Sequence, residues 1–365
     1  APISLMSRQI TNSTKSRRLI IFGTATIALY LALFFLLQSR SLWERTTLVA
    51  DRWPDLFQPL RDLFPREWVL ATRESALGLL NSFLYLVILA ALFAVYLLAA
   101  RWIFRSDSLT ATPAKRGFMV VLTVTLLVLA ILLCVPGSFT SDVYSYIYYG
   151  KIWSHYADNP LINYPSQYTW YDTSDWLQYV YWKDTPSAYG PAWLIIAGVI
   201  AWVARAIDND IVTHLMGHRL LAVIAHMVNV LLIWRVAGHV VARYWRWDGI
   251  DVEKRENQII RARLGVTLLY AWNPLLLIEF GANGHNDVLV LTCLLATILL
   301  HLNGRWRLAV GALGTDEHRN LDLGGRSFDA SVSPAALGDW CGDGQQPGFV
   351  DGGAQHLSVG QGDAH

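Results

Sequence analysis

The sequence predicts an all-α integral membrane protein, a multi-span helical bundle with a long external loop that carries interfacial helices. The first observation is composition: 54% of the 365 residues are hydrophobic, 16% are charged, and the mean hydropathy is +0.33. The second is a set of apolar segments long enough to cross a bilayer. The third is one loop rich in Tyr and Trp, which gather at membrane–water boundaries.

The same composition excludes several classes of protein. Twenty-nine basic and 28 acidic residues leave a formal charge of +1, so no charge excess favours nucleic acid or an acidic partner. The high apolar content excludes a disordered chain. Three cysteines without CxxC or Cys/His spacing indicate neither a disulfide framework nor a zinc site.

Seven segments are apolar enough to be spans, since a crossing helix needs roughly 20 such residues. They are residues 19–37, 77–100, 117–135, 191–207, 220–241, 264–280 and 288–302. The first is longer than the apolar part of a signal peptide and no small-residue cleavage pattern follows it, so we expect it to be retained.

Basic residues in short loops predict the orientation of a multi-pass protein in the plasma membrane. Lys and Arg precede the first predicted span and lie between the second and third, so residues 1–18 are predicted to be a cytoplasmic tail. Loop 136–190 then lies outside, and it holds only Lys151 and Lys183 as basic residues. Alternation over seven spans would also put the basic segment 242–263 outside, which leaves the topology after the fourth span open.

The external loop contains 11 Tyr and 4 Trp within residues 141–190. Helical spacing over residues 142–156 produces two faces. One carries Asp142, Tyr146, Tyr149 and Trp153, and the other carries Tyr144, Tyr148, Lys151 and His155. Such a helix suits the headgroup layer, and the aromatic stretch 168–182 predicts a second short interfacial piece.

Asp142 stands where the third predicted span emerges from the membrane. A carboxylate there is partly desolvated yet reachable by water, which suits a general base. With Ser141 it would equally well cap the first N–H groups of the helix, and spacing alone favours the cap.

Polar side chains also crowd the turn between the last two predicted spans. Asn283-Gly284 is typical of a turn, and Asn286 or Asp287 of a helix cap. Glu279 and His285 have no such structural explanation, and ionisable groups at span ends are functional candidates.

The remaining polar motifs have structural interpretations that we prefer. Tyr189-Gly190-Pro191 is typical of a helix start with a boundary tyrosine. The fifth predicted span carries a stripe of polar residues along one face. For these residues we prefer interhelical hydrogen bonding to the binding of a lipid phosphate. The members of the stripe are His218, Arg219, His226 and Asn229. Asp208 and Asp210 indicate a polar helix end rather than a metal site.

Three ordered motifs resemble those of prokaryotic membrane mannosyltransferases of the GT-C superfamily, which use polyprenyl-phosphate-mannose. They lie at residues 141–153 with Asn159-Pro160, at 189–193, and at 273–279 with 284–287. The resemblance covers residues 117–302 and implies a partial GT-C-like membrane core at 117–310. Residues 19–116 would then be an addition of two spans and their loops.

The resemblance implies that Asp142 is the catalytic base of an inverting glycosyltransferase. A sugar, expected to be mannose, would pass from a polyprenyl-phosphate donor to a glycan or lipid acceptor at the outer membrane face. Membrane lipids, the lipid-linked sugar and the acceptor are the expected partners, without nucleic acid, metal or cofactor. The residues expected to bind the donor sugar or phosphate are Tyr146, Lys151, His155, Tyr189, Arg219, Glu279, His285 and Asp287.

The resemblance further predicts that the turn 279–287 lies on the same side as Asp142 and lines the site. Alternation over seven spans places this turn on the cytoplasmic side. One predicted span must therefore be wrong if the two motifs meet.

Two rival classes stay open. A transporter or lipid flippase would favour ionisable residues near mid-span, where His226 and Asn229 are the main polar pair. A catalytically silent membrane scaffold is the other alternative.

The composition changes after residue 310. Residues 311–365 hold 12 of the chain's 26 glycines, no Lys and no run able to span a bilayer. We predict that this Gly-rich segment is disordered or the product of a shifted reading frame, and that the chain lacks part of the expected membrane core. The encoding DNA would decide, because a frameshift predicts long apolar segments in another frame.

Overall fold

The computed structural model describes residues 2–43, 47–105, 111–169, 174–244, 251–305 and 307–308, all within the unit Ala1–Thr315. Every regular element in this part of the chain is a helix, as the sequence predicts. The Gly-rich segment 311–365 lies outside the described residues.

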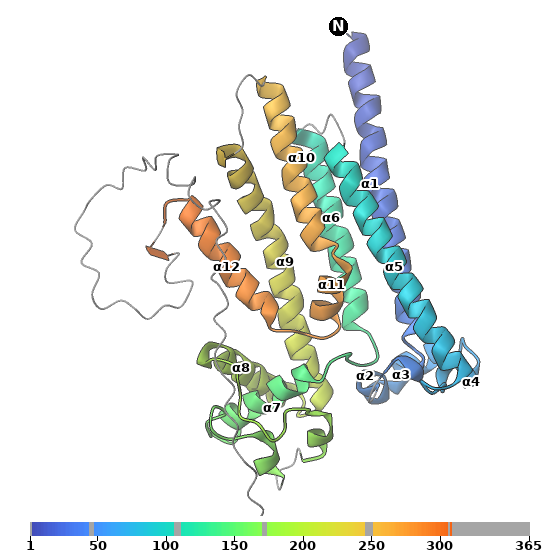
Figure 1. The fold of residues 1–365 in the computed structure, drawn as a ribbon, viewed down its shortest axis with the longest axis vertical. Coiled ribbons are helices and arrows are strands. Elements are labelled where there is room, and N and C mark those ends of the chain that lie inside the picture. The colour runs from blue at the N-terminus through green and yellow to red at the C-terminus, as the bar shows by residue number, and fades with distance from the viewer. Residues whose placement is uncertain are drawn as a thin grey trace, which may run out of the picture. The chain divides into compact units, whose positions relative to one another are not determined.

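The long helices form a bundle (Figure 1). They are α1 (Pro2–Leu36), α5 (Ala76–Arg105), α6 (Ala111–Leu133), α9 (Ile211–Tyr244), α10 (Val252–Ala271) and α12 (Asp287–Leu302). Four of them, α1, α5, α6 and α9, are each long and apolar enough to cross a membrane. Helix α10 and the short α11 (Pro274–Gly281) meet at a 49° bend and pass the same test as a pair.

The bend between α10 and α11 follows from the residues at the joint. Pro274 has no N–H and ends the hydrogen-bond ladder of the preceding helix. Asn273 starts a new helix, because its side-chain oxygen accepts from the backbone N–H groups of Leu275 and Leu276.

The bundle has two distinct ends. At one end, which we name the α7 end, lie α7 (Asp142–Ser154) and α8 (Pro191–Ile207) together with the short α2 (Leu48–Arg52), α3 (Pro54–Arg61) and α4 (Arg66–Val69) (Figure 1). At the opposite end α1 begins and α9 ends. Successive long helices run in alternating directions between the two ends (Figure 1).

Close helix packing and buried hydrogen bonds hold the bundle together. Gly23 of α1 lets α6 approach, because a Cβ there would lie 2.7 Å from Val124 and 3.4 Å from the buried Trp272. Asn81 of α5 is fully buried, and its amide donates to the hydroxyls of Ser39 and Ser41 at 2.9 and 3.1 Å. A buried amide without such partners would cost stability.

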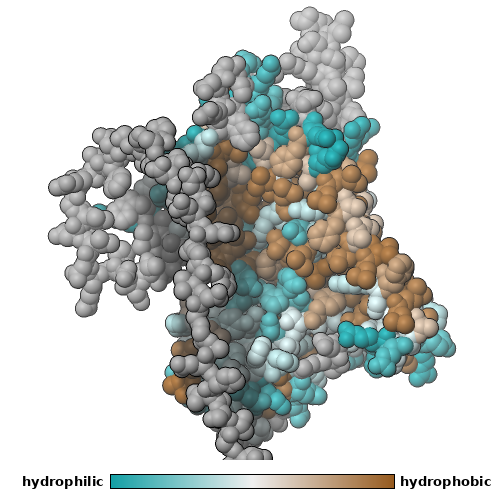
Figure 2. Space-filling model, viewed as in Figure 1, coloured by the Kyte–Doolittle hydropathy of each residue, from teal (hydrophilic) through white to brown (hydrophobic). Residues whose placement is uncertain are grey.

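The apolar surface lies on the long helices. Figure 2 shows hydrophobic residues gathered over the middle of the bundle, with hydrophilic residues toward both ends. Helix α5 contributes much of this surface, for example the exposed Leu79, Phe83 and Leu86. A bundle that exposes apolar side chains along its middle is suited to lipid.

The structure departs from two predicted spans, 191–207 and 288–302. The second is α12, whose 16 residues are fewer than in the helices that are long enough to cross a membrane. The first, 191–207, is α8. Helix α8 packs on α7 and on the first turns of α9, with both of its ends at the α7 end. Its Trp193 ring lies 5.9 Å from His218, which is only about 10 Å along α9 from Ile211. At its other end Asp208 pairs with Arg52 of α2 at 2.7 Å. Helix α8 therefore does not cross between the two ends.

Helix α7 forms over the predicted residues, but it is not an interfacial helix with one wet face. Residues 143–152 are all buried. Gly150 explains the tight contact with α8, because a Cβ there would lie 2.4 Å from the carbonyl oxygen of Ala197. The predicted second aromatic piece, 168–182, contains one short 3-10 helix, η3 (Ser174–Tyr179), among its described residues, and η2 (Pro165–Tyr168) precedes it. Its place at the membrane interface stays a prediction.

Candidate active site

The start of α7 is held in place by a buried arginine on α9. Arg219 is fully buried, and its guanidinium donates to the backbone carbonyls of Leu133, the last residue of α6, and of Val135 and Gly137 just after it. A charged donor is a strong partner for carbonyls that have no N–H partner at a helix end. Arg219 therefore fixes the segment that leads into Asp142.

Asp142 is the first residue of α7, and its half-buried carboxylate forms no hydrogen bond or ion pair with a described residue. Ser141 occupies the N-cap position without a side-chain cap hydrogen bond. The backbone N–H of Asp142 donates to the Thr140 hydroxyl at 3.2 Å. Within the described part of the chain, the Asp142 carboxylate itself has neither a hydrogen bond nor an ion pair. The helix-cap interpretation therefore has no geometric support.

The turn between α11 and α12 carries a hydrogen-bonded carboxylate–imidazole pair. His285 Nε2 lies 3.2 Å from Glu279 Oε2. Asn283 donates to the same oxygen at 2.9 Å, and its own carbonyl oxygen accepts from the Phe139 N–H at 2.9 Å. These hydrogen bonds join the turn to the loop segment around Phe139, which precedes Asp142.

Gly284 allows the turn to sit against α9. Its φ of +70° is a conformation that side chains with a Cβ rarely adopt. A Cβ at this position would also lie 3.2 Å from the backbone nitrogen of Arg219. The turn thus needs glycine for both its shape and its contact.

Tyr146 connects α7 to this turn. Its hydroxyl donates to Asn286 Oδ1 at 3.2 Å and lies 3.5 Å from His285 Nδ1. The Tyr189 hydroxyl donates to it at 3.4 Å. The ring of Tyr146 meets those of Tyr189 and Trp193 edge-on, at 5.2 and 5.1 Å between centroids. Segments nearly 140 residues apart in the sequence therefore share one network.

The charges at the site act on His285 from several sides. Burial lowers the pKa of His285, while the hydrogen bond to Glu279 and the charge of that carboxylate raise it. The charges of Asp142 and Asp287 also raise this pKa, which is above 6.5 on balance. The imidazole is thus biased toward its cationic form.

The two phenols of the site are biased toward their neutral form. Burial is the main cause that raises the pKa of Tyr146 and of Tyr189, and the charges of Asp142 and Asp287 add to it. Both carboxylates are therefore within electrostatic reach of both phenols. Neutral phenols remain hydrogen-bond donors across the physiological pH range.

The predicted residues that the structure brings together are Asp142, Tyr146, Tyr189, Glu279 and His285, with the exposed Asp287 at the start of α12. The hydrogen bond from Tyr146 to Asn286 places the turn 279–287 at the same end of the bundle as Asp142, as predicted. That the turn lines the reaction site stays a prediction. The conflict with alternation disappears because α8 does not cross.

Three predicted phosphate-binding cations have other partners in the structure. Lys151 is fully buried, donates to Asn209 at 3.1 Å and stands 4.3 Å over the Trp176 ring. His155 follows the end of α7 and bonds the Ser154 hydroxyl at 2.7 Å. Arg219 donates to the carbonyls at and just after the end of α6, as described above.

The other polar motifs have structural partners. Asn229 donates to the Tyr270 hydroxyl and to the Val288 carbonyl, both at 3.1 Å, which confirms its interhelical role. The His226 ring stacks on Tyr270 at 4.7 Å. Asp208 and Asp210 both face Arg52 of α2, at 2.7 and 3.7 Å.

Two members of the network were given only local roles by the sequence. Asn283 was expected to form a turn and Asn286 to cap α12. Asn286 does occupy the N-cap position, but its side chain makes no cap hydrogen bond and accepts from Tyr146 instead. No local pattern signals a partner 140 residues away.

Comparison with protein families gives a match over half of the chain. The model of the alpha-(1->6)-mannopyranosyltransferase family, N-terminal domain, matches residues 64–246. The chain belongs to this family. Comparison with curated proteins and with solved structures found no match.

The matched residues include α5 through α9, and hence Asp142, Tyr146 and Tyr189. The turn that carries Glu279 and His285 follows the matched segment and joins the site through hydrogen bonds. The chain is accordingly a mannosyltransferase-family protein, a glycosyltransferase, with a multi-pass helical bundle.

Proposed function

We propose that the chain transfers mannose, with inversion, from a polyprenyl-phosphate donor to a hydroxyl of a glycan or lipid acceptor. The observation that carries the proposal is the unpartnered carboxylate of Asp142 beside the network of Tyr146 and His285. A free carboxylate next to donors for a leaving phosphate meets the needs of glycosyl transfer.

In the proposed reaction Asp142 accepts the proton of the acceptor hydroxyl. The acceptor oxygen forms a bond to the anomeric carbon while the bond from that carbon to the phosphate oxygen breaks. The electron pair leaves with the lipid phosphate. Because inversion gives the alpha linkage in the family's name, the donor sugar would be beta-linked to its phosphate.

His285 is the cation best placed for the leaving phosphate. It takes the role that the sequence had offered to Lys151, His155 or Arg219. Its pKa is raised, chiefly by the hydrogen bond to Glu279 and the charge of that carboxylate, and this favours the cationic imidazole. A protonated imidazole stabilises the negative charge that develops on the phosphate.

Exposed aromatic rings at the α7 end are suited to contact the donor's sugar where it meets the lipid. Trp153, Tyr181 and Trp182 are exposed at the α7 end, by 43%, 62% and 51%. Amphipathic rings of this kind suit the level where a sugar headgroup meets lipid. A lipid-linked donor would present its sugar at that level.

We propose that the α7 end faces the outside of the plasma membrane. Arg101 and Arg105 near the end of α5, and the basic segment 242–263, then share the cytoplasmic side. With α8 no longer a span, the alternation of helices puts segment 242–263 on the same side as Arg101 and Arg105. The α7 end carries arginines of its own, among them Arg52, Arg61 and Arg66, so the orientation rests on the alternation of helices and on the basic segments at the opposite end.

The rival function of transport has less support. His226 and Asn229, the polar pair at mid-span, are buried and contact Tyr270 of the neighbouring helix. In this arrangement the two side chains take part in helix packing and do not line a transport path.

The proposal is tested with purified protein in liposomes, labelled polyprenyl-phosphate-mannose and a mannose-containing acceptor. We expect a labelled glycoside, and no product from a nucleotide-linked mannose. A flippase would instead move the labelled lipid across the bilayer without forming a glycosidic bond, which would overturn the proposal.

A further inference from the structure

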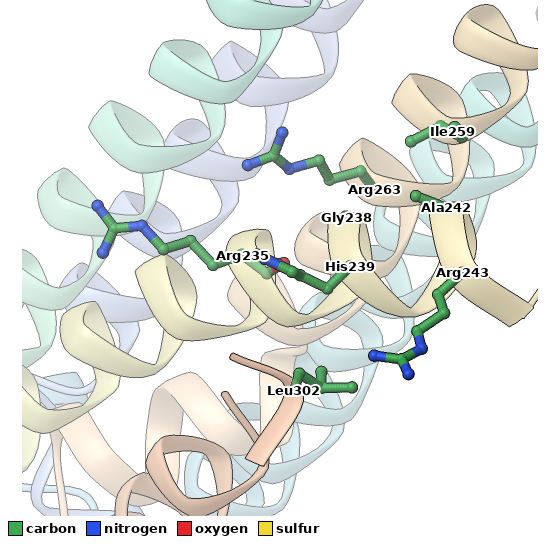
Figure 3. Close-up of a pocket in the computed structure, with 8 residues that line it drawn as sticks. All are labelled: Arg235, Gly238, His239, Ala242, Arg243, Ile259, Arg263 and Leu302. Atoms are coloured by element: carbon green, nitrogen blue, oxygen red, sulfur yellow. The ribbon is translucent and has the colours of Figure 1, made fainter. Parts of the chain in front are cut away.

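A cavity of about 460 Å³ lies at the opposite end of the bundle from Asp142, between α9, α10 and the last residue of α12 (Figure 3). Its charged and titratable lining residues are Arg235, His239, Arg243 and Arg263. Figure 3 shows Arg235 of α9 and Arg263 of α10 extending toward the same side, with His239 near them. The cavity therefore concentrates positive charge.

These guanidinium groups are not neutralised by the described part of the chain. Arg235 and Arg243 are exposed, and neither forms an ion pair with a described residue. Arg263 likewise has no carboxylate partner there. Three cations at one cavity without an anion favour a ligand that supplies the charge.

Arg263 is held in a defined position rather than moving freely in solvent. Its Nε donates to the Trp234 carbonyl, and its guanidinium lies 4.0 Å over the Trp234 ring. Gly238 makes room for it, since a Cβ there would lie 3.1 Å from Arg263 Nε. The Trp234 ring in turn stacks on Phe118 of α6 at 4.2 Å.

A second cavity, of about 690 Å³, adjoins the first and shares Ile259 and Arg263 with it. Most of its other lining is apolar. That lining is Phe118, Met119, Trp234 and Ile260, with Lys115 and Glu256. A basic cavity and an apolar cavity thus meet at one arginine.

We propose that these adjoining cavities bind an anionic phospholipid. Its phosphate would lie among Arg235, Arg243 and Arg263, and an acyl chain would follow Phe118 and Met119. Charge complementarity selects an anionic headgroup, and the apolar lining selects a lipid over a soluble phosphate. The site lies at the other end of the bundle from the proposed reaction and does not depend on it.

The proposal is tested by native mass spectrometry of the full chain, released from detergent with phosphatidylglycerol, phosphatidylcholine or inorganic phosphate. We expect retention of phosphatidylglycerol alone. The variant Arg235→Gln/Arg243→Gln should bind it about thirtyfold more weakly, since each cation near a lipid headgroup contributes a few-fold to tenfold.

Arg105→Gln is the matched control, because it removes one exposed arginine from the same end outside both cavities. It should bind phosphatidylglycerol as the unmodified chain does. Equal retention of phosphatidylcholine, or equal loss in the control and the double variant, would overturn the proposal. Retention of inorganic phosphate would instead indicate a site for a soluble anion.

Discussion

At the scale of residues, the account depends on the network that joins Tyr146 to the turn of Glu279 and His285. The sequence could single out Glu279 and His285, because ionisable groups at a span end have no other explanation. It could not assign their partners, because Asn286 and Asn283 carry the local pattern of caps and turns. Long-range hydrogen bonds such as that from Tyr146 to Asn286 depend on how the helices pack.

A pH profile tests the role of His285. Its pKa is raised mainly by Glu279 against the effect of burial, so a step that needs the protonated imidazole is lost as pH rises through that pKa. In Glu279→Gln the pKa of His285 should fall, and the alkaline limb of the activity profile should move to lower pH. The measurement is transfer rate against pH.

Glu67→Gln is the control, because Glu67 is an exposed carboxylate of α4 at the same end. It should leave the profile unchanged. If Glu279→Gln lowers the rate equally at every pH, the pair is structural and does not tune His285.

At the scale of elements, α8 shows where hydropathy alone misleads. The 17 residues of α8 are apolar enough in composition for a span, with Arg205 near the end, yet the helix packs against α7 and the first turns of α9. The informative signal is small residues at the contact: a Cβ at Gly198 would lie 2.0 Å from the Trp153 ring. Such pairings cannot be read without knowing which helices meet.

The position of α8 predicts a labelling pattern. Single cysteines at Lys183 and Asp208, both exposed and placed on either side of α8, should react with an impermeant thiol reagent from the same face of the membrane. A cysteine at His239 should react from the other face. Labelling of Lys183→Cys and Asp208→Cys from opposite faces would mean that α8 crosses the bilayer.

The contact between α7 and α8 predicts a stability effect. In Gly150→Ala the new Cβ meets the Ala197 carbonyl, which is backbone and cannot move aside. We expect a loss of about 1–3 kcal/mol, seen as a lower melting temperature by tryptophan fluorescence. Gly190→Ala, with no atom within 4 Å, should melt close to the unmodified chain. Equal melting of both variants would contradict the close packing.

At the scale of the whole molecule, the sequence predicts an all-helical bundle with several membrane spans, and this is confirmed. The apolar segments are long and interrupted by charges, so their helices follow from the cost of unpaired backbone in lipid. The direction of each helix depends on the exact number of crossings. When α8 is not counted as a crossing, the alternation of helices places Asp142 and His285 at the same end, as the structure does.

The most direct test of the central claim is mannose transfer by Asp142→Asn. The amide keeps the size of the side chain but cannot accept the acceptor's proton, so transfer from polyprenyl-phosphate-mannose should fall about 100- to 10,000-fold while folding is retained. Asp175→Asn, an exposed aspartate at the same end, should transfer normally. Near-normal transfer by a well-folded Asp142→Asn protein would contradict the assignment of Asp142 as the base.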